Sequence, residues 1–151
     1  MSERYITKYT YDEVSEILKT IQSCVAGDRF IISQNINRAE NIEFITKHNL
    51  TMVRIKNIIS RIETDDFCYG LRNENIGFKH EVLYVFCPQI ELAYGNTVEV
   101  VDVYSKFNII NNERVVVISF HQRNYPIEYL FKLNTADRSK VNENECEDDV
   151  L

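Results

Sequence analysis

Residues 98–123, VEVVDVYSKFNIINNERVVVISFHQR, contain the pattern that decides the fold. Residues 98–110 predict a long strand, because side chains from Val101 to Ile109 alternate between a core face and a polar face with the two-residue period of a half-buried strand. The β-branched run from Arg114 to Arg123 predicts a second long strand. Between them lies Asn111-Asn112, and asparagine tolerates the positive φ angles of a tight turn. We therefore predict a long antiparallel hairpin.

The length of this turn decides which side chains share a face. A two-residue turn at Asn111-Asn112 places Tyr104 opposite Ser119, and it likewise places Asp102 opposite His121. A four-residue loop pairs Tyr104 with His121 and keeps the same parity, whereas a three-residue loop reverses it. With either even-numbered loop, the exposed face is expected to carry Asp102, Tyr104, Lys106, Ser119, His121 and Arg123.

The first half of the chain has helical periodicity. Thr10 and Glu13 have the spacing of a capping box, and apolar residues recur at helical intervals from Val14 to Val25. Gly27 is the expected left-handed residue that closes this helix. Residues 29–33 then predict a short strand or an extended connector.

Two more helices are expected before the strands begin. Residues 38–48 predict a helix with Ile42 and Ile45 facing the core. Thr51 is expected to cap a third helix, whose apolar face runs from Val53 to Ile62.

The second half changes to the period of strands. Residues 63–77 are rich in acids, asparagine and glycine and are interpreted as a linker. Residues 81–86 predict a strand that ends before Pro88, and residues 129–133 predict a short last strand. The predicted class is α+β, with N-terminal helices packed on a C-terminal antiparallel sheet of about four strands.

Length and charge predict a single domain followed by a tail. The 151 residues suit one domain, expected over residues 1–140. The formal net charge is −6, and residues 141–151, VNENECEDDVL, contain five acids and no base. That tail is expected to be disordered, and the folded body is close to neutral. No membrane segment or signal peptide is recognised, so a cytoplasmic protein is expected.

Motifs for metals and cofactors are missing from the sequence. The four cysteines are widely spaced, without the short intervals of a zinc site. No glycine-rich nucleotide loop is present, and Ser119 lacks the surroundings of a hydrolase nucleophile. We therefore expect neither a metal nor a cofactor. His48 is interpreted as structural, because a cation is favoured at the end of a helix.

The polar face of the hairpin fits one kind of chemistry. A ribonuclease that uses the 2′-hydroxyl of its substrate needs groups that exchange protons, positive charge near the phosphate, and aromatic rings for the bases. Tyr104 and His121 are candidates for proton exchange, while Lys106 and Arg123 supply charge. Asp102 is expected to orient His121.

The motifs also follow a familiar order. Asp66-Phe67 is followed by VYSKF at Val103–Phe107 and by VISFH at Val117–His121. Across roughly residues 10–132, this order resembles the MqsR-like toxins of bacterial toxin–antitoxin pairs. That family is similar in fold to the RelE-type mRNA interferases, which cut mRNA without a metal ion. The resemblance implies RNA as substrate and a cognate antitoxin protein as partner.

The resemblance also implies roles for individual residues. Tyr104 and Lys106 match the Tyr-x-Lys of the family, and His121 stands where the family has a basic residue after Ser-Phe. Tyr69 occupies a position at which the best-known members carry a lysine. His80, or Glu81 beside it, falls near a polar residue that the family uses. Tyr69, His80 and Arg123 are therefore expected to contact the substrate.

Two functional hypotheses follow from the sequence. The first is a metal-independent endoribonuclease toxin with Tyr104, Lys106 and His121 as catalytic residues. The second is a non-enzymatic regulator or inhibitor that binds a protein and is encoded by a phage or mobile element. The near-neutral body and the acidic tail favour the second hypothesis.

Overall fold

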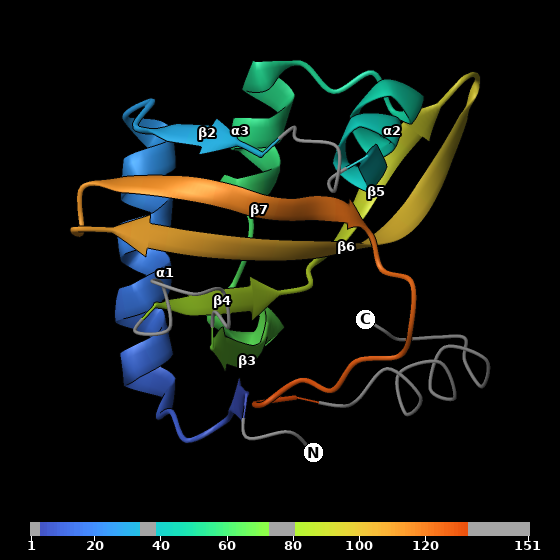
Figure 1. The fold of residues 1–151 in the computed structure, drawn as a ribbon. Coiled ribbons are helices and arrows are strands. Elements are labelled where there is room, and N and C mark those ends of the chain that lie inside the picture. Colours follow the sequence, from blue (N-terminus) through green and yellow to red (C-terminus); the bar gives the residue numbers. More distant parts are fainter. Residues whose placement is uncertain (1–3, 34–38, 73–80, 133–151) are drawn as a thin grey trace.

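The computed structural model describes residues 4–33, 39–72 and 81–132. Within them the chain forms three α-helices and seven strands (Figure 1). The helices are α1 (Tyr11–Ala26), α2 (Ala39–Lys47) and α3 (Met52–Ser60). The strands are β1 (Tyr5–Ile6), β2 (Phe30–Ile32), β3 (Phe67–Arg72), β4 (Val82–Phe86), β5 (Gln89–Tyr94), β6 (Thr97–Ile110) and β7 (Arg114–Gln122).

The strands form one sheet in the order β1-β3-β4-β6-β7-β2, and β5 pairs with the first half of β6. Every pair is antiparallel except β2 with β7, which is parallel. The predicted α+β class is confirmed. The sheet is larger than the four strands expected, and the helices are not segregated at the N-terminus, because β1 and β2 also join the sheet.

Three parts of the predicted strand pattern were wrong. The expected linker contains β3, whose Gly70 is needed because a Cβ there would lie 2.6 Å from the Tyr9 hydroxyl oxygen. The strand β5 directly follows Pro88 and was missed. Residues 129–132 form no strand, and the Leu130 amide instead donates a single hydrogen bond to the Phe67 carbonyl (3.1 Å).

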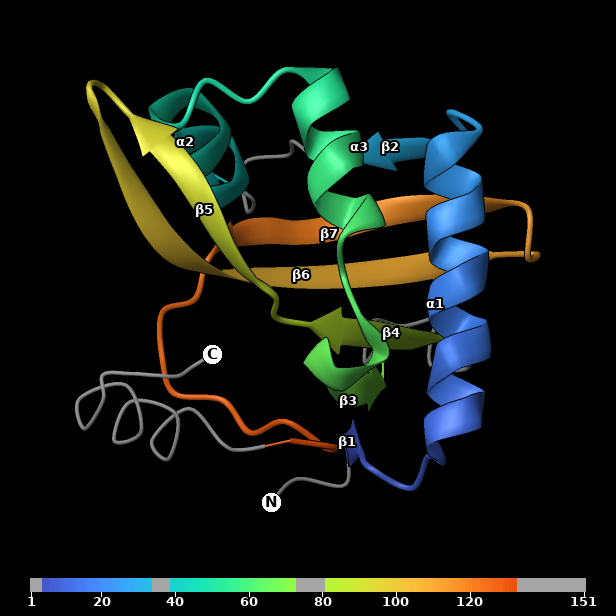
Figure 2. The same ribbon diagram turned by 180° about the vertical axis from the view of Figure 1, so that it is seen from behind.

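Helices α1 and α3 cover one face of the sheet, and α2 stands at its upper edge beside the end of β7 (Figure 2). The core lies between α1, α3 and the sheet. Its largest fully buried side chains include Phe67, Phe86, Phe107 and Phe120. Residues 123–132 leave the end of β7 and run along the lower edge of the sheet towards β1 (Figure 1). None of the described helices has both the length and the apolar composition that crossing a membrane needs.

The helix ends agree with the sequence only in part. The capping box of Thr10 and Glu13 is present, with hydrogen bonds of 2.8 and 3.1 Å. The prediction that Gly27 is left-handed was wrong, because its φ is −88°. The left-handed residue after α1 is Asp28, with a φ of 63°. Thr51 caps α3 as expected, but Val53 is 75% exposed.

The inward face of α2 agrees with the prediction at Ile45, which packs against the core, but not at Ile42. Asn41 and Phe44 are buried, whereas Ile42 is 45% exposed. Asn41 faces inward because its amide has partners there. Its Nδ2 donates to the carbonyls of Ser33 and Ile118 (both 3.0 Å), and its Oδ1 accepts from the Phe120 amide (2.8 Å). Asn41 therefore continues the edge pairing of β7 where β2 has ended.

The hairpin of β6 and β7 combines an odd loop with an extra residue. Asn111 and Asn112 have φ angles of 54° and 57°, but the ladder begins at Ile110 opposite Arg114, so three residues form the loop. The predicted two-residue turn was wrong. A β-bulge at Ile118 then shifts the register by one residue.

This bulge decides what each face carries beyond it. Phe107 pairs with Val117 before the bulge, and Lys106 pairs with Ser119 after it. Tyr104 consequently lies opposite His121, as the four-residue alternative would have placed it. Without the extra residue, Phe120 would take the position opposite Tyr104 and leave the core.

Candidate functional site

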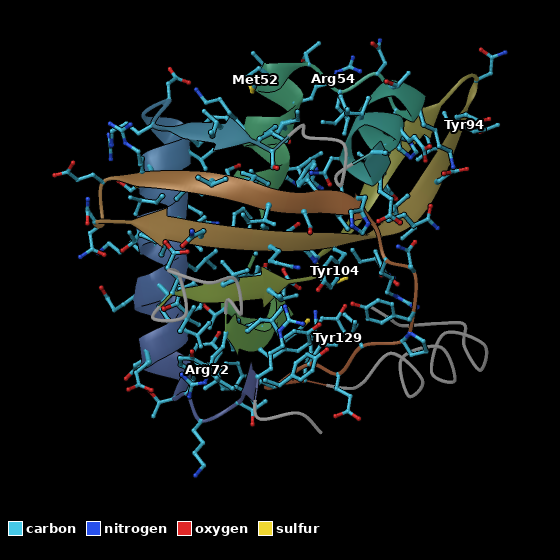
Figure 3. The ribbon with its side chains drawn as sticks, viewed as in Figure 1. Met52, Arg54, Arg72, Tyr94, Tyr104 and Tyr129 are labelled. Atoms are coloured by element: carbon cyan, nitrogen blue, oxygen red, sulfur yellow. The ribbon has the colours of Figure 1, made fainter. Side chains whose placement is uncertain are left out.

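A small hollow opens on the face of β6 and β7 that α1 and α3 leave uncovered. It has a volume of about 170 Å³. Its walls come from α2, β6, β7 and the segment after β7. The lining residues are Glu40, Asn41, Tyr104, Lys106, Ser119, His121, Asn124 and Tyr125. The structure thus brings together the three predicted catalytic residues, and Figure 3 shows Tyr104 below β6 on the side along which residues 123–132 run.

His121 is held by two contacts and faces a third group. Its ring stacks on Tyr104, with centroids 5.5 Å apart and an interplanar angle of 27°. Its Nδ1 lies 2.9 Å from the Gln122 carbonyl oxygen, so in the neutral ring Nδ1 carries the proton and Nε2 the lone pair. Nε2 lies 3.7 Å from Oε1 of Glu40. This tautomer directs the basic nitrogen towards the hollow.

Lys106 brings positive charge to the same hollow. It lies opposite Ser119, and its Nζ is 5.9 Å from the centroid of the Tyr104 ring. An ammonium group beside an imidazole nitrogen can neutralise an anion while the imidazole exchanges a proton. The two side chains come from neighbouring strands and line the same hollow.

Asp102 and Arg123 form an ion pair with each other. Nε of Arg123 donates to Oδ2 of Asp102 (2.8 Å), and NH1 donates to the Tyr125 carbonyl (3.2 Å). The expected pairing of Asp102 with His121 was wrong, because the observed register places Tyr104 opposite His121 and Asp102 beside Arg123. The carboxylate next to the His121 ring is that of Glu40. The Arg123 guanidinium therefore holds the chain after β7 in place.

Tyr104 and Tyr69 form a buried pair of phenols. Tyr104 is only 5% exposed, and its hydroxyl lies 3.3 Å from that of Tyr69. Burial raises the pKa of both phenols well above the usual value. Both phenols are therefore neutral at physiological pH, and Tyr104 is unsuited to accept a proton there. Its ring instead supports His121.

This burial predicts a loss of stability in alkali. Below pH 10 both the folded and the unfolded chain keep their phenols protonated, but above it only the unfolded chain releases the proton of Tyr104. Tyr104 is therefore expected to lower the free energy of unfolding by about 1.4 kcal/mol for each pH unit above roughly 10. Denaturant titrations from pH 9.5 to 11.5 should show a shallower decline for Tyr104→Phe. Equal slopes for both proteins in that range would contradict the prediction, and between pH 6 and 8 equal slopes are expected.

The remaining predicted contacts lie elsewhere. His80 is outside the described residues. Oε1 of Glu81 accepts a hydrogen bond from Nδ2 of Asn108 (3.2 Å), and Glu81 lines a separate hollow of about 550 Å³. Among the described residues, no group of three or more His, Cys, Asp or Glu side chains could hold a metal ion. Cys24, Cys68 and Cys87 are buried.

Sequence reasoning missed the part of the site that α2 and the chain after β7 supply. Oε2 of Glu40 accepts from the side-chain amide of Asn124, 84 positions later in the chain. No local pattern announces such a contact. The sequence did contain one signal for the orientation of α2. Asn41, Phe44 and His48 recur at helical spacing, and the structure buries all three.

Comparison with known proteins adds no relative. No protein-family model matches this sequence, and no curated protein matches it at a significant level.

Proposed function

We propose that this protein is an endoribonuclease of the MqsR-like kind, which cuts RNA by attack of the 2′-hydroxyl. The observation that supports this proposal is the hollow that Lys106 and His121 both line, together with aromatic rings. In the reaction, a base removes the 2′-hydroxyl proton and O2′ bonds to phosphorus. The bond to the 5′-oxygen then breaks, and that oxygen receives a proton. The products are a 2′,3′-cyclic phosphate and a 5′-hydroxyl end.

The side chains divide these tasks. Nε2 of His121 takes the proton from the 2′-hydroxyl and returns a proton to the 5′-oxygen, because Nε2 is the nitrogen left without a hydrogen in the neutral ring. Lys106 neutralises the negative charge that develops on the phosphorus oxygens. Tyr104 is a positioning residue for His121, and Arg123 positions the chain after β7. A cognate antitoxin, which would cover this surface, belongs to the same proposal.

A second candidate is a non-enzymatic protein that binds another protein. The β5–β6 hairpin favours it, because Tyr94, Val98 and Val100 are 50–67% exposed on this arm. Exposed apolar side chains that cluster on one arm are a feature of protein-binding surfaces. The Glu40 carboxylate in the hollow, which would repel a phosphate, also favours this candidate.

Expression in bacteria separates the two candidates. The nuclease is expected to arrest growth and deplete mRNA, and the double variant Lys106→Ala, His121→Ala is expected to restore growth. Lys19→Ala removes an exposed lysine on α1 and serves as the matched control, which should remain toxic. Harmless expression of the soluble wild-type protein, or equal toxicity of the double variant, would favour the binding protein.

A further inference from the structure

We propose that a second hollow beside the first binds one nucleobase of the RNA, an inference that rests on the proposed nuclease function. This hollow has a volume of about 310 Å³, the lower end of the range for ligand sites. It lies between β1, β3 and residues 125–130. The side chains that matter here are Tyr5, Tyr69, Tyr125, Ile127, Glu128 and Tyr129.

The walls of this hollow, here called the tyrosine hollow, suit a flat aromatic ligand. Tyr5 and Tyr69 meet edge to face, with centroids 4.9 Å apart. Tyr5 is 37% exposed and Tyr125 is 50% exposed, so both rings offer accessible surface. Bases stack on such rings regardless of their identity, because every base has a π face.

The tyrosine hollow adjoins the proposed reaction site and shares a wall with it. Tyr125 lines both hollows. The hydroxyls of Tyr69 and Tyr104, one from each hollow, lie 3.3 Å apart. A strand whose phosphate lies between Lys106 and His121 can therefore place a neighbouring base against Tyr125. This adjacency is the reason to name a nucleobase as the occupant rather than an unrelated small molecule.

The walls of the tyrosine hollow are fixed before any ligand binds. The Tyr129 hydroxyl donates to the Cys87 carbonyl (2.7 Å), and Nζ of Lys132 donates to Oδ1 of Asp66 (2.8 Å). These bonds tie the chain after β7 to the sheet. A site that is already formed loses little conformational entropy on binding, which favours affinity.

Glu128 adds a preference among bases. Its side chain is exposed and lines the tyrosine hollow, where a carboxylate can accept a hydrogen bond from an exocyclic amino group. Cytosine has such a group and uracil lacks it. The tyrosine hollow is therefore expected to favour cytosine over uracil, and Glu128→Ala is expected to remove this preference.

Fluorescence of a base analogue tests the proposal without requiring cleavage. The probe is a short oligonucleotide with one 2-aminopurine and 2′-O-methyl groups throughout, which cannot undergo 2′-hydroxyl attack. Stacking on a tyrosine is expected to quench the 2-aminopurine. Tyr125→Ala is expected to weaken binding roughly 5- to 100-fold and to remove the quenching. Tyr125→Phe should retain both.

Tyr94→Ala is the matched control, because Tyr94 is also 50% exposed but lies at the end of the β5–β6 hairpin, far from Tyr104 (Figure 3). Unchanged binding by Tyr125→Ala, or an equal loss in Tyr94→Ala, would overturn the base subsite. Quenching that depends on Tyr125, together with intact unmethylated RNA, would support the subsite while refuting the nuclease. Cleavage without quenching would refute only the subsite.

Discussion

Replacing Asn41 with alanine is expected to lower the free energy of unfolding by about 3–5 kcal/mol, because it leaves several buried backbone groups without partners. The Asn41 side chain is fully buried and makes three hydrogen bonds of 2.8–3.0 Å. Two of them satisfy β7 at the bulge, through the Ile118 carbonyl and the Phe120 amide. Water cannot easily replace the lost amide at so buried a position.

Equilibrium unfolding in urea measures this effect. Ile42→Ala is the matched control, because Ile42 lies on the same turn of α2 and is 45% exposed. Its truncation is expected to cost less than about 1.5 kcal/mol. Equal losses for the two variants would contradict the role assigned to the Asn41 hydrogen bonds. A second readout is the position of His121, since a distorted bulge is expected to broaden or shift its imidazole NMR signals.

Replacing His121 with alanine is expected to reduce kcat for RNA cleavage roughly 10²- to 10⁴-fold, the range for removal of a group that exchanges protons. KM is expected to change less, because the Lys106 charge and the aromatic walls remain. Quenched-flow or gel assays on a short RNA give both constants. Added imidazole should restore part of the rate if the missing group is the proton carrier.

Controls for the His121 experiment come from the same strand and from the neighbouring helix. Arg114→Ala removes an exposed side chain at the far end of β7 and should keep the wild-type rate. Glu40→Gln is expected to change kcat less than His121→Ala, because Glu40 lies 3.7 Å from the His121 ring and does not itself exchange the proton. If His121→Ala cleaved as fast as the wild type, His121 would have no part in the chemistry.

The sequence predicted the β6–β7 hairpin well because residues 101–109 alternate over a long stretch. It could not predict the register. The extra residue at Ile118 lies within VVVISF, where nothing local distinguishes a bulge from a regular strand. The groups that stabilise the bulge come from Asn41, 77 positions before Ile118 in the chain. A tertiary contact of that range leaves no trace in a local pattern.

The same limitation explains the errors at Asp102 and at the missing strands. Asp102 was paired with His121 on a turn two residues long, and the real loop plus the bulge moved each partner by two positions. The strand β3 was interpreted as a linker because acids precede it and Gly70 interrupts it. Packing against Tyr9 outweighs that composition once the sheet has formed.

One turn of α2 carries two residues with separate roles. Asn41 stabilises the strand, and the adjacent Glu40 sets the charge around the His121 ring. A drifting sequence could exchange Glu40 for another residue and retune the reaction while the scaffold survives. Asn41 does not have that freedom. Homologous sequences should therefore vary at position 40 far more than at position 41.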